Sequence, residues 1–457
     1  MSVIQNERKY LFVCIIIAIA LCVAQVMGNT ILILGALALF MLLLGWCCCG
    51  NFTLPILLFF LPWSPIMRLA TDSFSFYTFG LLLVCLLGII RKRFIFHQYQ
   101  IKSTVILLAI TLLSKLLDGS SLTFSYVQFV IMLLLFPIIS DEQCAKKYNY
   151  YLAVVFFGLG IIIASLCAMH FSEYSNIRKF IRVDSYLTIV RRCGFYGDPN
   201  FYVAQILAAL GGSLVLMLQE SKKRIIVLGV QSVFLLYCGF LSGSKSFVLI
   251  FALILFLWIV ALLSMPRRTG LKIVLLMFLG GVTIYVATSA AFGELINVII
   301  TRFSFSNNLD SFTTGRSDLW VSYAKEIFGS AKVFFLGKGY TNVKVNGRGS
   351  HNTIIQSFYQ FGLIGVPVLF YWVSCYFRQA NPNRTAQHKA GLKQWIVIVG
   401  SFIPWLAIDV LFFDEFFLFP MYVCLAIKEL SQASDYLGTN EIANQYGGKY
   451  GRTGNDK

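Results

Sequence analysis

Charged residues are scarce in this chain. They make up 12% of its 457 residues, whereas hydrophobic residues make up 58%. In soluble globular domains about a quarter of the residues are charged. The scarcity of charge therefore excludes a soluble domain and predicts an integral membrane protein.

The residue patterns of metal and redox centres are also missing. The chain has no Asp-x-Asp pair, no Cys-x-x-Cys pair and no Cys/His cluster with the spacing of metal ligands. An Asp-x-Asp pair would hold the divalent metal that nucleotide-sugar enzymes commonly use. Most of the 12 cysteines lie within apolar runs, where cysteine behaves as a small hydrophobic residue. We therefore expect no metal and no cofactor.

Apolar stretches of roughly 17–25 residues, the length of a membrane-spanning helix, recur along the chain. Two shorter stretches, 54–66 and 416–430, raise the count further. The sequence thus predicts an all-α polytopic membrane protein with about 12–14 transmembrane helices. The longer stretches are 10–27, 31–48, 75–90, 101–117, 122–139, 150–169, 201–217, 225–241, 247–263, 271–291, 353–377 and 394–412.

The distribution of Lys and Arg predicts the orientation of these spans. With fourteen spans and the N-terminus inside, 22 of the 37 basic residues fall in cytoplasmic loops and tails, and three fall in short external turns. This satisfies the positive-inside rule and predicts that both termini are cytoplasmic. Because the basic residues are spread over many short loops, they do not form the single patch that binds nucleic acid.

The other twelve basic residues lie in two longer external segments, about 170–200 and about 292–352. Positive charge gathered there indicates an anionic ligand at the outer face of the membrane. A merely solvated loop is the alternative, because long loops escape the positive-inside rule.

The first external segment ends in a turn at the membrane surface, where Gly194, Gly197 and Pro199 precede an apolar stretch. Either Asp198 or Asn200 can cap the helix that follows. The free N–H groups at the start of that helix would then also face an incoming anion. Helix capping alone is an equally good explanation of Asn200.

The second external segment contains a predicted amphipathic helix of about three turns, with Leu319, Tyr323 and Ile327 on one face. Arg316 stands at its start. A cation there opposes the helix dipole, so binding a phosphate beside the exposed N–H groups explains it better than stability does. An ion pair with a nearby aspartate, Asp310 or Asp318, is the alternative.

His351 lies at the mouth of a predicted span, next to the arginine-bearing loop. The ordinary pKa of histidine, about 6.5, suits a group that accepts the proton of a hydroxyl. A structural role is the alternative for a histidine at the membrane interface.

Four short motifs follow one another in this part of the chain. They are Arg191-x-x-Gly194 with Gly197-Asp198-Pro199-Asn200, Thr314-Gly315-Arg316 with Trp320, Gly337-x-Gly339, and His351-Asn352. In this order, over roughly residues 190–415, they resemble the bacterial O-antigen polymerase and ligase family. The resemblance implies a GT-C-like glycosyltransferase architecture. It also implies three parts of the chain: residues 1–190 with N-terminal spans and the first external loop, 191–430 as the polymerase/ligase-like membrane domain with external loop 292–352, and 431–457 as a cytoplasmic polar tail.

The resemblance also implies roles for individual residues. Arg191 and Arg316 would bind the diphosphate of an undecaprenyl-linked glycan, and His351 would be the base or orient the acceptor. Arg192 fits the diphosphate role as well as Arg191 does. Lys245 stands where the family often carries arginine, and it keeps the charge without the two-pronged guanidinium. The substrate-binding residues that we expect are Arg192, Gly194, Asn200, Lys245, Arg302, Trp320, Lys338, Arg348, Asn352 and Asp409.

Three functions remain open. The first is a polymerase that joins undecaprenyl-diphosphate-linked repeat units of O antigen, capsule or exopolysaccharide at the outer face of the bacterial cytoplasmic membrane, with inversion and without a metal. The second is a ligase that transfers the finished glycan to lipid A core or to a protein, and the third is a flippase or transporter, which would carry charged residues inside its spans. The expected partners are the lipid-linked oligosaccharide and the bilayer, with a chain-length regulator and a flippase as candidate proteins and no nucleic acid.

Overall fold

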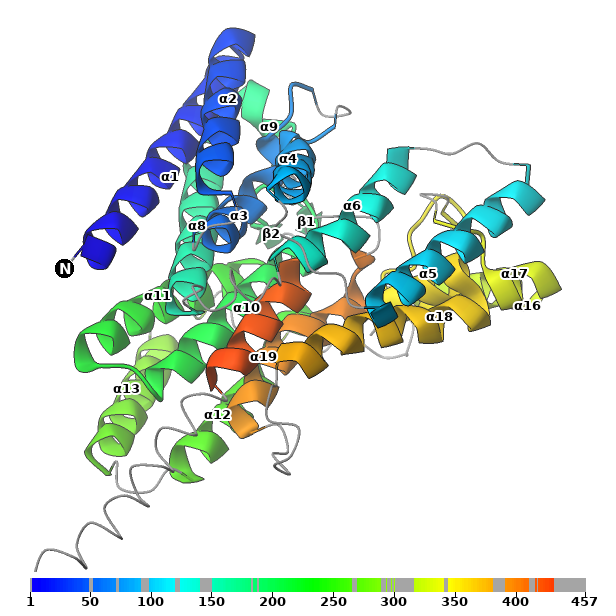
Figure 1. The fold of residues 1–457 in the computed structure, drawn as a ribbon. Helices are drawn as coiled ribbons and strands as arrows, with labels where there is room; N and C mark the ends of the chain where they lie inside the picture. The colour runs from blue at the N-terminus through cyan, green and yellow to red at the C-terminus, as the bar shows by residue number, and fades with distance from the viewer. Residues whose placement is uncertain are drawn as a thin grey trace, which may run out of the picture.

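Apolar helices make up most of the structure, a computed structural model (Figure 1). The residues that it describes are 2–48, 52–70, 74–91, 98–119, 124–139, 150–181, 184–186, 189–264, 269–288, 293, 297, 300, 316–340, 344–380, 391–410, 416 and 418–430. The predicted cytoplasmic tail, 431–457, lies outside them.

Eight helices of the described chain are long and apolar enough to cross a membrane. A helix satisfies its own backbone hydrogen bonds, which lipid cannot do, and apolar side chains stabilise it there. This is therefore a multi-pass membrane protein, as the sequence predicted. The eight are α1 (Ser2–Met27), α2 (Thr30–Cys47), α5 (Gln98–Leu117), α8 (Tyr150–His170), α10 (Pro199–Met217), α11 (Lys222–Leu241), α12 (Lys245–Ser264) and α18 (Thr353–Ala380).

Every other predicted span also coincides with a helix. The stretch 54–66 is α3 (Thr53–Phe60) continued by the 3-10 helix η1 (Leu61–Ile66), and residues 418–430 are helical within the stretch 416–430. How many of these shorter helices cross the bilayer stays a prediction. The remaining ones are α4 (Phe76–Ile90), α6 (Phe124–Ile139), α13 (Thr269–Thr288) and α19 (Leu392–Phe402), which continues into η2 (Ile403–Ala407).

Helix α10 lies at the centre of the bundle and is buried along almost its whole length. It packs against α8, α11, α12 and α19. Small residues allow the close approach to α19, because a Cβ added at Gly400 would lie only 2.7 Å from the carbonyl oxygen of Leu207. Trp258 of α12 donates its indole N–H to the carbonyl of Leu214 at 2.8 Å. These contacts fix the middle and the carboxyl half of α10 within the bundle.

Helix α18 is broken at Gly362, which has φ 63° and ψ −175°. The segment after α17 packs against this break, where the backbone N–H of Lys338 donates to the carbonyl of Tyr359 at 2.8 Å. A Cβ at Gly337 would collide with the carbonyl of Gln360. The glycines of the Gly337-x-Gly339 motif thus allow two backbones to touch.

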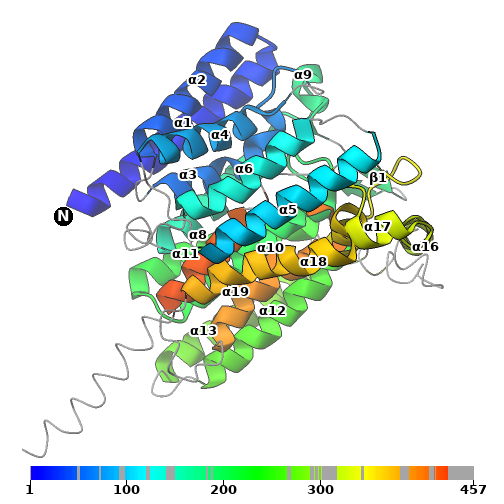
Figure 2. The same cartoon turned by 45° about the vertical axis from the view of Figure 1, so that its right-hand side comes forward.

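Small elements gather at the end of the bundle away from the N-terminus (Figure 2). They are α9 (Ser175–Arg178), the antiparallel hairpin of β1 (Asp184–Tyr186) and β2 (Ile189–Arg191), α16 (Arg316–Phe328) and α17 (Ala331–Leu336). The hairpin was not predicted, because three-residue strands are too short to show an alternating pattern.

The predicted amphipathic helix is confirmed as α16. Leu319, Tyr323 and Ile327 are its buried residues, and they pack with Val345 and Tyr359 into a small apolar cluster of their own. This cluster fixes α16 to the first turns of α18, so that Arg316 at the first position of α16 has a defined place.

Candidate active site

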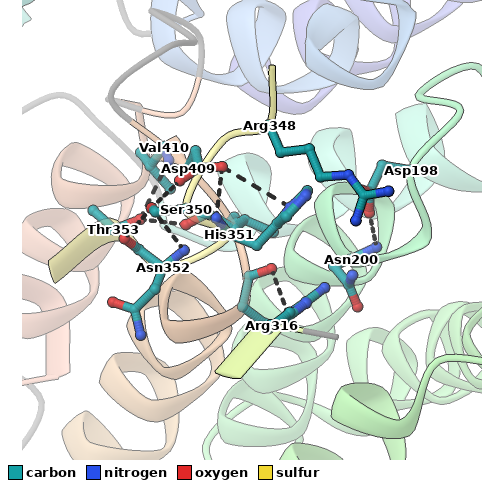
Figure 3. A network of polar contacts seen from close by, with 12 residues as sticks. Asp198, Asn200, Arg316, Arg348, Ser350, His351, Asn352, Thr353, Asp409 and Val410 are labelled. Atoms are coloured by element: carbon teal, nitrogen blue, oxygen red, sulfur yellow. Dashed lines mark hydrogen bonds and ion pairs between the residues drawn. The ribbon is translucent and has the colours of Figure 1, made fainter. Parts of the chain in front are cut away.

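The turn before α18 is bonded to the chain that follows α19. The carboxylate of Asp409, only 3% exposed, accepts hydrogen bonds from the Ser350 hydroxyl and from the His351 backbone N–H, the latter at 2.8 Å. The Thr353 hydroxyl donates to the carbonyl of Ile408 at 2.7 Å. A buried carboxylate is costly unless it is hydrogen-bonded in this way. The turn is therefore fixed at the mouth of α18 (Figure 3).

The backbone of His351 adopts a left-handed conformation, with φ 49°. Such a conformation is uncommon for residues other than glycine and persists where the surroundings impose it. Here the bonds of Asp409 to Ser350 and His351 impose it. Strain of this kind at a titratable residue is typical of functional sites.

The imidazole of His351 is partly exposed, and its Nδ1 lies 3.9 Å from Oδ2 of Asp409. Burial lowers the pKa of His351 below its ordinary value, and Arg316 and Lys344 lower it further, whereas Asp409 and Asp198 raise it. Because the net shift is downward, the imidazole is neutral at neutral pH. It can accept a proton there.

Arg316 is the first residue of α16, and its Nη1 donates to the carbonyl of Ala407 at 3.2 Å. Burial lowers its pKa, Asp198 and Asp409 raise it, and Arg191 lowers it. A guanidinium stays charged despite such a shift. These interactions place Arg316 among the charges of both turns.

The alternative ion pair of Arg316 with Asp318 is not found in the part of the chain that the structure describes. Among the residues described in the structure, Arg316 forms no salt bridge, and Asp318 is exposed on α16. Asp310 lies outside the described residues, as do Arg302 and the Thr314-Gly315 part of the motif.

Arg191 ends β2 and is only 8% exposed. Its Nε donates to the carbonyl of Ser242 at 3.0 Å, and the backbone N–H of Arg192 donates to Leu241 at 3.1 Å. The side chain of Arg192 is exposed. Since Arg191 acts electrostatically on Arg316, geometry favours Arg191 over Arg192 as its companion.

Asp198 is the cap of α10. Its Oδ1 accepts the backbone N–H of Asn200 at 2.7 Å, and Pro199 occupies the first helical position. The Oδ1 of Asn200 accepts hydrogen bonds from Ser244 at 3.0 Å and from Ser246 at 3.1 Å. Asn200 thus joins α10 to the turn that carries Lys245, and capping does not explain it.

Arg348 belongs to a tight turn in which Asn346 and Gly347 have positive φ, a typical Asn-Gly hairpin turn. The Tyr323 hydroxyl donates to the carbonyl of Arg348 at 2.9 Å. Figure 3 shows the exposed guanidinium of Arg348 reaching toward Asp198 and Asn200.

Two other predicted site residues, Trp320 and Asn352, form hydrogen bonds with the backbone around the turn before α18. The Trp320 indole donates to the carbonyl of Ser350 at 2.9 Å, and Asn352 caps α18 by accepting the N–H of Ile354 at 3.0 Å. Figure 3 shows the Asn352 side chain pointing away from the His351 ring. These two residues hold the turn in place.

Two further predicted residues have other surroundings. Lys338 lies 4.0 Å from a carboxylate oxygen of Glu326, and among the described residues no hydrogen bond or ion pair joins it to His351 or Arg316. Gly194 has φ 57°, and a Cβ there would press on the ring of Tyr202 at 3.0 Å, so it serves the fold of the first turn.

Sequence reasoning missed three residues that build the site. Ser350 and Thr353 hold the turn to Ile408 and Asp409, and Tyr323 was read only as part of an apolar face. The position of Ser350 directly before His351 was the one available signal. Within the described residues, no group of three or more His, Cys, Asp and Glu side chains is placed to hold a metal ion.

The assembled site combines the guanidinium groups of Arg316 and Arg191, the imidazole of His351 and the carboxylates of Asp198 and Asp409. Arginines bind phosphate with charge-assisted, often paired hydrogen bonds. The arrangement suits the binding of a diphosphate beside a group that accepts a proton. No protein-family model and no curated protein matches this chain.

Proposed function

We propose that this protein is a glycosyltransferase that polymerises undecaprenyl-diphosphate-linked oligosaccharide repeat units at the outer face of the bacterial cytoplasmic membrane. One observation carries the proposal: His351, whose turn is fixed by Asp409 with a positive φ, lies within the electrostatic reach of Arg316, which in turn lies within that of Arg191. The likeness of its motifs to the O-antigen polymerase and ligase family supports the choice of substrate.

The reaction needs two kinds of group. A hydroxyl of the acceptor sugar attacks the anomeric carbon of the donor, the bond from that carbon to the diphosphate oxygen breaks, and a new glycosidic bond forms. Arg316 and Arg191 stabilise the negative charge of the departing diphosphate. His351 takes the proton of the attacking hydroxyl. A single displacement inverts the anomeric carbon.

The position of the site supports its assignment to the outer face. The elements α9, β1, β2, α16 and α17 gather at the end of the bundle away from the N-terminus. If both termini are cytoplasmic, as the positive-inside rule predicts, this end faces outward. A chain-length regulator and a flippase remain predicted partners.

The contacts of Asp409 favour an enzyme over a transporter. Asp409 is the clearest charged residue within the predicted spans, and a charge there in a transporter would line an ion or substrate path. Its carboxylate is instead bonded to Ser350 and His351.

The deciding experiment supplies purified protein with a defined undecaprenyl-diphosphate oligosaccharide and separates the products on a gel. We expect a ladder of products that remain attached to the lipid. A reaction that starts only after lipid A core or a protein acceptor is added would show a ligase instead. Failure of both, with intact protein, would overturn the enzyme proposal.

A further inference from the structure

A cavity of about 300 Å³ lies beside Arg191. Its walls come from the outer end of α8, from α9 and from the chain around Arg191 to Gly194. Small-molecule sites span ~300–1,000 Å³, so this cavity has room for about one sugar ring. Neither Arg316 nor His351 lines it.

The charge of this cavity is strongly positive. Arg178, Arg191 and Arg192 line it together with a single carboxylate, Glu173, which leaves an excess of two positive charges. Arg178 and Arg192 are exposed, and neither forms an ion pair with a residue that the structure describes. The carboxyl end of α8 adds only a partial negative charge, roughly half a unit.

Arg191 is the wall shared by the cavity and the reaction centre. Its Nε donates to the carbonyl of Ser242, which holds the guanidinium in place, and its charge acts on Arg316. A glycan whose reacting end lies at Arg316 and His351 would place a neighbouring sugar beyond Arg191. The polar walls, with Ser172 and the arginines, suit a sugar better than an acyl chain.

We propose that this cavity binds an acidic sugar of the glycan, such as a uronic acid, through Arg178 and Arg192. The proposal rests on the proposed function and adds the substrate class: repeat units that carry a carboxylate. It gives Arg192 a role distinct from that of Arg191, and it adds Arg178, which the sequence motifs do not include.

The test compares a disaccharide containing glucuronic acid with its methyl ester, in which an added methyl group removes the negative charge. Calorimetry on the purified full-length protein should give at least about tenfold tighter binding of the acid, as expected for charged hydrogen bonds. Arg178→Gln and Arg192→Gln should each remove most of this preference. Lys179→Gln is the matched control, because Lys179 neighbours Arg178 and lies over the ring of Phe180 without lining the cavity.

Equal binding of acid and ester, no binding of either, or unchanged preference in both arginine variants would overturn the proposal. A second experiment repeats the binding measurement with the protein in nanodiscs of anionic or of neutral lipid. If an anionic lipid headgroup displaces the acidic disaccharide, the cavity binds lipid and the proposal is overturned. Melting temperatures of the variants verify that they are folded. In His351→Ala the preference should remain while polymerisation is lost, so active polymerisation in that variant contradicts the proposed function and not the cavity.

Discussion

The two turns that meet at the site are built alike but present different groups. Asp198 caps α10 after the first turn, and Asn352 caps α18 after the second. In the first turn, Nε of Arg191 and the amide oxygen of Asn200 bond neighbouring chain. Its side chains therefore form a fixed, charged wall.

The second turn is held by Asp409, which lies outside the turn, 58 residues further along the chain than His351. It holds the backbone of the turn and leaves the imidazole partly exposed. Under the proposed function, the first turn would bind the diphosphate and the second turn would carry the group that accepts the proton. Replacing Asp409 should therefore shift the pH dependence of the reaction more than replacing Asp198, which raises the pKa of His351 to a smaller extent.

The largest expected effect comes from removing the reacting or charged side chains. His351→Ala, Arg316→Ala and Arg191→Ala should each abolish product, because loss of a general base alone costs about 10²–10⁴-fold in rate. The products are measured on gels, with membrane insertion verified for each variant. His170→Ala is the matched control, since His170 is exposed at the end of α8. Full activity in any two of the three variants would refute the site.

Arg316→Lys should be severely impaired, with a smaller loss than Arg316→Ala. Lysine keeps the charge, but its ammonium cannot make the planar, two-pronged contact with phosphate. Initial rates at varied donor concentration measure the loss, and Lys325→Arg, on the same helix, is the control. A wild-type rate in Arg316→Lys would count against bidentate binding.

Asp409→Asn should change the pH profile. Asp409 raises the pKa of His351 in the wild-type protein, so its neutral replacement lowers that pKa further. Because a base acts in its neutral form, kcat/KM of the wild type should fall in acid with a midpoint below about 6.5, and the variant's midpoint should lie lower still. A midpoint that moves upward or stays fixed would contradict the coupling of these residues.

The same variant loses an acceptor for the His351 backbone N–H or the Ser350 hydroxyl. An unsatisfied buried group costs about 1–3 kcal/mol. A lower melting temperature than that of the wild type should therefore accompany the shifted profile.

The smallest expected effect is on stability. It distinguishes whether Asp198 stabilises the first turn through its capping hydrogen bond or through its charge. Asp198→Ala should destabilise the protein by about 1 kcal/mol, whereas Asp198→Asn, an equally good cap, should change stability by much less. Thermal unfolding of the two variants measures the difference. Equal destabilisation by both would mean that the charge of Asp198, and not its hydrogen bond to Asn200, stabilises the turn.

Hydropathy predicted the spans well because lipid leaves the chain few choices. A stretch such as 201–217 has to be helical wherever it lies in the bundle. Helical periodicity likewise identified the buried face of α16 through Leu319, Tyr323 and Ile327. These features depend on neighbours along the chain.

The site depends on contacts between distant residues, which the sequence does not display. Nothing near Asp409 in the chain points to Ser350 and His351. Asp and Asn cap helices equally well, so the choice between Asp198 and Asn200 needed the position at which α10 begins. The break at Gly362 was hidden inside one apolar stretch.

The central claim is that guanidinium groups and a neutral imidazole surround a diphosphate leaving group at the outer end of the bundle. The most direct test is a cryo-EM structure with a donor analogue whose anomeric oxygen is replaced by carbon. The account predicts diphosphate oxygens bonded to Arg316 and Arg191, with the His351 ring facing the anomeric carbon. A diphosphate bound away from all three residues would contradict it.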